Sequence, residues 1–335
     1  MNHDLAALDG TKLGNYLLIR ELGRGGNGVV YLAQQQVLER AVACKILFPE
    51  LAVKQQYTDK FLQEARHSAR LSHPNIVQAL DAGVDSGLYF FVMEYVNGTS
   101  LEHWRLHSPE KLTPRFLLDM AVQLAQAMEY AWEFHHITHG DIKPDNLLIT
   151  NETPHRLKLA DLGLARVNCY GDDDEIMATP VYVAPEVITQ SIKNPDPRSD
   201  IYSFGVMFYE LSCGKAPFAG NMEEILAKHV KEIPLELIRQ NPDMDVELAG
   251  FIDRMLAKNI AARPASWSEV KNTLLRIKNR LYPRRTAVPK EDNRVWQDEF
   301  NKASRQNPVG KRWQIICIIL TLILLLAAAA LLLMR

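Results

Sequence analysis

Short apolar runs, broken by glycines or polar turns, follow one another from residue 16 to about residue 96. The runs YLLIREL, GVVYLAQ, RAVACKILF, NIVQALDAG and LYFFVMEYV are rich in β-branched and apolar residues, which is typical of strands. One segment, DKFLQEARHSARL, has apolar or small residues at helical spacing, with Phe61, Leu62, Ala65 and Ala69 on one stripe. The pattern predicts a β-rich lobe with one helix.

From about residue 97 the apolar period becomes helical and continues to residue 282. PRFLLDMAVQLAQAMEYAWEFHH predicts a long amphipathic helix with Pro114 near its start, where proline is tolerated. Further helices are predicted at RSDIYSFGVMFYELSCG, VELAGFIDRML and SWSEVKNTLLRIKNRL. The predicted fold class is therefore α+β: an N-terminal extension (1–15), a β-rich lobe (16–96) and an α-rich lobe (97–282).

The last part of the chain differs from both lobes. Residues 283–312 are polar and interrupted by prolines, and their eight basic and four acidic residues give a net charge of +4. Residues 315–334 are then free of charge, and a helix of about 20 residues spans the roughly 30 Å of a bilayer core. A buried helix of a soluble core is the alternative.

The residues that flank the uncharged segment favour the membrane. Trp313 lies where an interfacial aromatic residue belongs, and basic residues precede the segment while Arg335 alone follows it. We therefore predict a basic juxtamembrane linker (283–312) and a transmembrane tail anchor (313–335). We expect the lipid bilayer to be a partner and the preceding lobes to lie in the cytoplasm.

Overall composition excludes several classes of function. The 335 residues suffice for about two domains, and 38 basic against 40 acidic residues give no field that attracts nucleic acid. The four cysteines are far apart, without the spacing of a metal site or of a disulfide framework. No nucleic acid partner is expected.

The first candidate for chemistry is the glycine-rich segment GRGGNGVV. Gly23, Gly25 and Gly28 have GxGxxG spacing, but a dinucleotide-binding fingerprint requires a helix after the glycines, and VVYLAQ favours a strand. A glycine hairpin can lay its N–H groups over phosphates because no Cβ intrudes. A plain tight hairpin is the alternative.

The second candidate is Lys45, which lies inside the apolar strand-like run AVACKIL. A lysine in such a run extends to water or pairs with an acid. Glu64, on the predicted helix, is the natural partner. Taken alone, this pair favours a structural role over a catalytic one.

The third candidate is ITHGDIKPDNLLI (137–149), which carries too many polar groups for an ordinary core segment. Asp141 and Asn146 lie in it, and LKLADLGLA supplies Asp161 after another strand. Asn146 and Asp161 offer the oxygen ligands that suit Mg²⁺ beside phosphates. Asp141 would accept the proton of a substrate hydroxyl, and Lys143 would neutralise a transferred phosphoryl group.

These motifs follow a known order. GxGxxGxV (Gly23 to Val30), VACK, HGDIKPDN, DLG and APE (Ala184 to Glu186) resemble the signature set of the eukaryotic-type (Hanks-type) protein kinases over about residues 16–280. With the predicted span, the chain resembles membrane-anchored Ser/Thr kinases of bacteria. The resemblance implies a bilobal protein-kinase fold, ATP and Mg²⁺ (or Mn²⁺) as cofactors, and proteins bearing Ser or Thr as substrates.

The resemblance also assigns the nucleotide site. Glycines cover the phosphates, Lys45 holds the α and β phosphates while paired to Glu64, and an apolar sandwich with a hinge backbone holds the adenine. Met93 would guard the pocket behind the hinge. The implied ATP-binding residues are Gly23, Gly25, Gly28, Val30, Ala43, Lys45, Glu64, Glu94, Val96 and Leu148.

For catalysis, the resemblance makes Asp141 the base, lets Lys143 steady the γ-phosphate, and gives the metal to Asn146 and Asp161. Thr179 would bridge Asp141 and Lys143. Two further roles are structural: Asp200 braces the catalytic loop from below, and Arg263 pairs with Glu186. His139 is expected to be a core histidine that supports the loop.

Gly140 departs from the family, which usually has an arginine there that grips a phosphorylated activation loop. Residues 164–178 contain no serine or threonine and carry an acidic run, Asp172 to Glu175. That run is either a solvated turn or built-in negative charge. We expect activity without loop phosphorylation. The second departure, Leu162 in DLG, keeps an apolar side chain of similar reach.

Two other functions fit parts of the pattern. A small-molecule phosphotransferase of the aminoglycoside-kinase type shares HGD followed by asparagine, but such enzymes usually lack the glycine-rich loop and the APE segment with its substrate platform. A pseudokinase scaffold usually lacks the lysine or an aspartate that this chain retains. Self-association for autophosphorylation in trans is a further expectation, with Thr286 or Ser304 as acceptors.

Overall fold

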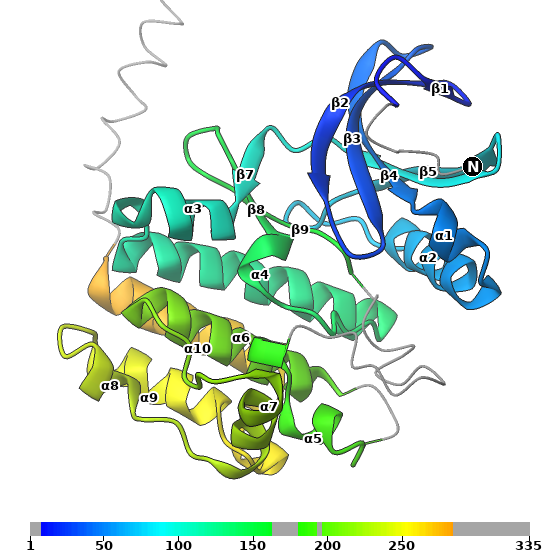
Figure 1. Ribbon diagram of the computed structural model, residues 1–335. Helices are drawn as coiled ribbons and strands as arrows, with labels where there is room; N and C mark the ends of the chain where they lie inside the picture. The colour runs from blue at the N-terminus through cyan, green and yellow to red at the C-terminus, as the bar shows by residue number, and fades with distance from the viewer. Residues whose placement is uncertain (1–7, 163–179, 193–195, 284–335) are drawn as a thin grey trace, which may run out of the picture. The chain divides into compact units, whose positions relative to one another are not determined.

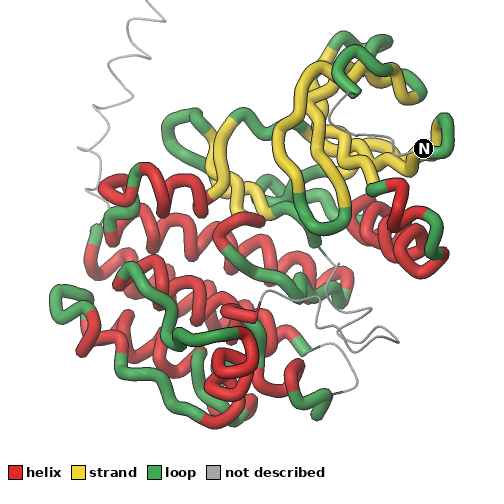
Figure 2. Tube along the Cα trace, in the orientation of Figure 1, coloured by secondary structure: helices red, strands yellow, loops and turns green. Residues whose placement is uncertain are grey.

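The computed structural model describes residues 8–162, 180–192 and 196–283, and the chain up to Tyr282 belongs to one compact unit. Figure 1 shows the early strands gathered on one side of this unit and most helices on the other, and Figure 2 shows the same division by element type. Within these described ranges, no helix is both long enough and apolar enough to cross a bilayer. The predicted anchor, 313–335, lies outside them.

The β-rich lobe contains an antiparallel six-stranded sheet in the order β1-β2-β3-β4-β6-β5. Its bounds are β1 (Lys12–Leu13), β2 (Tyr16–Arg24), β3 (Gly28–Gln35), β4 (Arg40–Leu47), β5 (Ala79–Asp85) and β6 (Leu88–Glu94). The sheet begins before residue 16, because β1, which lies inside the predicted N-terminal extension (1–15), pairs with β2. A two-residue strand is too short to show alternation in the sequence, although Leu13 is buried.

Two helices accompany this sheet: α1 (Pro49–Ala52) and α2 (Gln55–Ala69). On α2 the buried positions include Phe61, Glu64 and Ala65, whereas Ala69 is exposed. The predicted apolar stripe was therefore wrong at Ala69. The buried face includes a glutamate, which a search for apolar residues excludes by design.

The α-rich lobe contains a small antiparallel sheet in the order β7-β8-β9 and a set of packed helices. The strands are β7 (Gly98–Ser100), β8 (Leu147–Thr150) and β9 (Leu157–Leu159), and the α-helices are α3 (Leu101–His107), α4 (Pro114–His135), α5 (Pro185–Ile188), α6 (Pro197–Cys213), α7 (Met222–Lys231), α8 (Leu237–Gln240), α9 (Val246–Met255) and α10 (Trp267–Leu281). Single 3₁₀ turns are η2 (Pro109–Lys111), η3 (Pro144–Asn146), η4 (Pro180–Tyr182) and η5 (Ile260–Ala262).

Helices α4 and α6 build the centre of this lobe, and α9 and α10 pack beside them (Figure 1). The four helices predicted from the sequence correspond to α4, α6, α9 and α10. The remaining helices, α3, α5, α7 and α8, were not predicted. Helices α3, α5 and α8 have only 4 to 7 residues and complete too few turns to show a clear period.

The segment before β5 joins the two lobes. Ile76 forms an isolated parallel bridge with Leu159, and the N–H of Val77 donates to the Leu159 carbonyl at 2.9 Å. Asn75 donates through Nδ2 to the Leu157 carbonyl at 2.8 Å. These contacts tie the segment after α2 to strand β9. They bring Glu64, on α2, toward Asp161, which follows β9.

Candidate active site

Lys45, Glu64 and Asp161 meet in one buried cluster. Lys45 Nζ, on β4, lies 2.9 Å from Glu64 Oε1 on α2 and 3.0 Å from Asp161 Oδ1 after β9. Lys45 is 8% exposed and Glu64 is 1% exposed. The Lys45–Glu64 pair was predicted, whereas the direct contact of Lys45 with Asp161 was not. The cluster unites residues from both lobes.

The charges in this cluster depend on one another. Burial alone would lower the pKa of Lys45, but the Asp161 and Glu64 carboxylates raise it on balance. Burial likewise opposes ionisation of Asp161, yet Lys45 holds the pKa of that carboxyl below its usual value. Burial raises the pKa of Glu64 to about 7 against the opposing effect of Lys45, and Glu64 Oε2 has no hydrogen-bond partner. Lys45 is therefore a charged ammonium facing an ionised Asp161.

The catalytic-loop segment is held from two sides. Asp200, at the start of α6, accepts hydrogen bonds from the backbone N–H of His139 at 2.7 Å and of Gly140 at 2.8 Å. The ring of His139 accepts from the Asp141 N–H through Nδ1, so Nε2 carries the proton and donates to the Ala160 carbonyl at 3.0 Å. The predictions for Asp200 and His139 are confirmed.

Asp141, Lys143 and Asn146 are linked within the same loop. Lys143 Nζ lies 2.6 Å from Asp141 Oδ2, and Asn146 Nδ2 donates to the Asp141 carbonyl at 2.8 Å. Because the amide nitrogen of Asn146 is engaged, its oxygen Oδ1 is the atom oriented for a cation. The Asn146 backbone carbonyl accepts from Ala160 N–H at 2.9 Å, which sets Asn146 beside the neighbour of Asp161.

Asp161 has a left-handed backbone conformation, with φ 56°. Aspartate tolerates this region better than most residues. The turn directs the Asp161 carboxylate toward Lys45, while the next residue, Leu162, is 2% exposed in the core of the α-rich lobe. The Asn146 backbone is thus bonded to the residue before Asp161, and Asp161 itself pairs with Lys45. The side-chain oxygens of Asn146 and Asp161 are of the kind that suits a hard cation with phosphate oxygens as its remaining ligands.

The glycine-rich segment is the β2–β3 hairpin, so a strand follows the glycines and no dinucleotide-binding helix does. A Cβ added at Gly28 would lie 2.1 Å from the Ile46 carbonyl oxygen, whereas nothing lies within 4 Å of one added at Gly23 or Gly25. Gly28 is required by the close approach of β3 to β4. Gly23 and Gly25 leave their backbone open to a ligand.

The residues expected to enclose the adenine belong to one apolar cluster. Ala43 and Met93 are buried in it, and Val30, Val96 and Leu148 pack against it. Ala160 joins the same cluster, a contact that the sequence analysis missed. Ala160 lies between strand β9 and Asp161, and its place directly before Asp161 in an apolar run was the available signal.

The backbone N–H and the side chain of Glu94 are both hydrogen-bonded within the protein. Its N–H donates to the Gln78 carbonyl at 2.9 Å, and its side chain binds the Gln78 N–H and Lys158 Nζ. The backbone group of Glu94 that suits an adenine amino group is therefore the carbonyl rather than the amide.

Residues 16–275 match the model of the protein kinase domain. The chain belongs to the protein kinase domain family.

Curated relatives of this kinase domain include a probable serine/threonine-protein kinase of Clostridium acetobutylicum, 33% identical over 275 residues, which covers 81% of this chain and 41% of the relative. Serine/threonine-protein kinase PknB of Mycolicibacterium smegmatis is 33% identical over 272 residues, covering 78% of this chain and 43% of that protein. The chain thus spans less than half the length of these relatives.

Solved structures agree on the fold. The PknI kinase domain of Mycobacterium tuberculosis matches with a TM-score of 0.64 at 27% identity, covering 80% of this chain and 98% of that one. A structure titled PpkA-294 apo form matches with a TM-score of 0.67 at 25% identity, covering 79% and 98%. The bilobal protein-kinase fold predicted for residues 16–282 is therefore confirmed.

Several positions with predicted roles lie outside the described residues. These positions are Thr179, the acidic run Asp172 to Glu175, Thr286 and Ser304. Their expected roles stay predictions.

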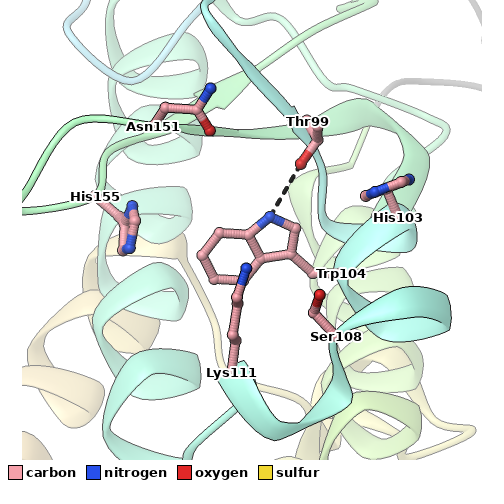
Figure 3. A pocket seen from close by; sticks show the side chains of 7 residues that line it. All are labelled: Thr99, His103, Trp104, Ser108, Lys111, Asn151 and His155. Carbon is pink, nitrogen blue, oxygen red and sulfur yellow. Dashed lines mark hydrogen bonds between the residues drawn. The ribbon is translucent and has the colours of Figure 1, made fainter.

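A separate cavity of about 250 Å³ lies on the α-rich lobe beside α3. Figure 3 shows the indole of Trp104 inside it, donating through Nε1 to Thr99 Oγ1 at 2.9 Å, with Lys111 against the ring. Its lining residues are Thr99, His103, Trp104, Ser108, Lys111, Asn151 and His155. None of the predicted site residues lines this cavity.

Proposed function

We propose that this chain is a protein serine/threonine kinase that transfers the γ-phosphate of ATP to Ser or Thr hydroxyls of proteins. The carrying observation is the convergence of Lys45, Glu64 and Asp161 in one cluster, next to a loop that joins Asp141 to Asn146. The relatives named as serine/threonine-protein kinases support the acceptor type. Lys143 in DIKPDN supports it too, by resemblance.

In the proposed reaction, the hydroxyl oxygen of the protein substrate attacks the γ-phosphorus of ATP. The bond between that phosphorus and the β–γ bridging oxygen breaks, and ADP leaves. Asp141 accepts the hydroxyl proton, and Lys143, which lies beside Asp141, offsets charge on the γ-phosphoryl oxygens. Lys45, oriented by Glu64, binds the α and β phosphates, so the chain contributes positioning and charge neutralisation.

The donor set fits a divalent cation, as argued above for Asn146 and Asp161. Asn146 and Asp161 would hold Mg²⁺ (or Mn²⁺), which would supply neutralisation of the phosphate charge. Asp161 stays ionised beside Lys45, which keeps its oxygens available as ligands.

The test is phosphoryl transfer from labelled ATP with Mg²⁺ or Mn²⁺, offered casein or myelin basic protein in one reaction and a sugar alcohol in another. We expect label on serine or threonine of the protein, and a loss of several powers of ten in rate for Asp141→Asn. Asp243→Asn, at an exposed aspartate of the α-rich lobe, is the matched control and should retain the wild-type rate. Label on the sugar alcohol alone would favour a small-molecule phosphotransferase. Nucleotide binding without any transfer would favour a pseudokinase.

The proposal includes activity without phosphorylation of residues 164–178. Gly140 has no side chain with which to hold a phosphate, and those residues contain neither serine nor threonine. Phosphatase treatment should therefore leave the rate unchanged. Loss of activity that returns with a phosphate mapped to residues 164–178 would contradict this part alone.

We also propose that residues 313–335 anchor the kinase in a membrane with its catalytic lobes in the cytoplasm. The support is the uncharged segment 315–334 and the basic residues before it. The full chain should remain in the membrane pellet after alkaline carbonate extraction, while a chain ending at residue 312 should be released. Equal release of both chains would refute the anchor.

Self-association for autophosphorylation in trans follows from holding copies on one surface. Mixing an Asp141→Asn chain with a shorter active chain should label the inactive one, with Thr286 and Ser304 as the expected positions. Label on the active chain with none on the inactive chain would instead indicate transfer within one chain.

A further inference from the structure

Three consecutive hydrogen bonds run through the interior of the α-rich lobe and end on the backbone carbonyl of Val181. Lys258 Nζ lies 3.1 Å from Tyr202 Oη, which lies 2.9 Å from His229 Nδ1, and His229 Nε2 lies 2.8 Å from Val181 O. Tyr202 belongs to α6, His229 to α7 and Val181 to η4, and Lys258 follows α9 (Figure 1). The relay therefore joins four separate elements.

The direction of each hydrogen bond is determined by its ends. An ammonium group only donates and a carbonyl only accepts. Tyr202 therefore accepts from Lys258 and donates its own proton to His229 Nδ1, and His229 donates from Nε2 to Val181. Each ring nitrogen has one role, so His229 is the neutral imidazole with its proton on Nε2.

The surroundings of His229 hold the ring in place. His229 is fully buried, and the ring of Phe218 packs edge-on against it at 4.9 Å between centroids. Lys258 Nζ also donates to the His229 backbone carbonyl at 2.7 Å. Burial, assisted by Lys258, lowers the pKa of His229 to about 4, in agreement with a neutral ring.

Val181 is half-buried and lies in a short turn of the fold. Its turn, η4, follows directly on Thr179 in the sequence and precedes the APE motif, which by resemblance belongs to the substrate platform. A single 3₁₀ turn has few hydrogen bonds of its own. Its position therefore depends on contacts with neighbouring elements: His229 at Val181, and Glu210, which accepts from Tyr182 Oη at 2.6 Å.

We propose that His229 is a positioning residue for the protein substrate, because it fixes the Val181 carbonyl and hence the 180–182 turn on which the polypeptide acceptor lies. This inference rests on the proposed kinase function and adds a specific determinant to it. No bond of the relay reaches Lys45, Glu64 or Asp161, so the nucleotide site is built independently of it.

The kinetic test compares two substitutions in the full chain. His229→Phe fills the space but removes both hydrogen bonds, whereas in His229→Gln the amide nitrogen reaches the position of Nε2 and still donates to Val181. For His229→Phe we expect kcat/KM for the protein substrate to fall roughly ten-fold, the scale of one lost hydrogen bond that leaves a carbonyl unsatisfied. KM for ATP should stay within about two-fold. His229→Gln should recover most of the loss, and His107→Phe, at an exposed histidine of α3, should behave as wild type.

A second measurement tests the relay without requiring activity. In long-range ¹H–¹⁵N spectra of the full chain labelled with ¹⁵N-histidine, assigned by loss of one signal in His229→Gln, His229 should show the neutral Nε2–H form at pH 6. An Nδ1–H form, or titration of this ring near its ordinary pKa, would overturn the relay.

The remaining outcomes separate the two proposals. Parallel losses toward ATP and protein in His229→Phe, or no loss toward either, would overturn the positioning role while leaving the kinase proposal intact. A His229→Gln variant as defective as His229→Phe would likewise overturn the positioning role and leave the kinase proposal intact. A wild-type chain that transfers no phosphate would remove the kinase function and the positioning role together, whatever the spectra show.

Discussion

Arg263 donates two parallel hydrogen bonds to the carboxylate of Glu186, from Nη1 at 2.7 Å and from Nη2 at 2.8 Å, and both residues are buried. The Oγ of Ser199 donates to the same carboxylate at 2.7 Å. The pair links the APE motif to the segment after α9. Its presence was predicted by resemblance, and its geometry has a direct consequence for stability.

Arg263→Ala should lower the free energy of unfolding by about 3–5 kcal/mol, because the Glu186 charge would remain in the interior without its partner. Denaturant unfolding of the full chain in detergent measures this. Arg276→Ala is the matched control: Arg276 pairs with Glu247 at the surface, and its loss should cost less than about 1 kcal/mol. Similar losses for the two variants would mean that the buried Arg263–Glu186 pair contributes no more to stability than a surface ion pair.

Glu64→Gln should lower kcat/KM for ATP about 100-fold, the usual scale for one charged group that organises an electrostatic site. The substitution keeps the shape of the side chain but removes the charge that orients Lys45 at 2.9 Å. Steady-state kinetics with varied ATP measure it, with the neighbouring Gln63→Ala on the same helix as control. An unchanged kcat/KM would show that Asp161 alone suffices to position Lys45.

Two glycines of the β2–β3 hairpin should separate stability from nucleotide binding. Gly28→Ala should lower the melting temperature of the nucleotide-free chain, because the added Cβ would lie 2.1 Å from the Ile46 carbonyl oxygen. Gly25→Ala meets nothing within 4 Å, so it should melt as wild type while gaining less stability from added ATP. Thermal unfolding with and without ATP measures both. Equal melting temperatures for the two nucleotide-free variants would contradict the steric argument.

Local pattern predicted the parts of this fold that are long or that carry a motif. Strand β4 and helix α4 have enough residues to show their period, and the Lys45–Glu64 pair follows from a charged residue in an apolar strand. Strand β1 could not be predicted, because two residues establish no alternation. The burial of Glu64 and the exposure of Ala69 could not be predicted either, because a charged residue is expected at the surface and an apolar one in the core.

Contacts set by tertiary structure were out of reach for a different reason. Lys45 and Asp161 are 116 residues apart, and His229 lies 27 residues from Tyr202 and 48 from Val181. No local spacing relates such residues. Resemblance supplied the roles of Lys45 and Asp161 because the family's motifs mark them, whereas His229 lies outside every motif that was recognised.

Stability should depend on pH through His229. Burial lowers the pKa of His229 to about 4 in the folded chain, against 6.5 for an unperturbed histidine. Below pH 6.5 the unfolded chain therefore binds a proton that the folded chain does not, so the contribution is complete above that pH and declines as the pH falls toward 4. At pH 5 the loss should be about 2 kcal/mol relative to pH 7.5.

His229→Gln cannot titrate and should lack this part of the slope, so the difference in unfolding free energy between wild type and variant should shrink by that amount. Denaturant unfolding at both pH values measures it, and parallel pH profiles for the two chains would show that His229 is protonated equally in the folded and unfolded states.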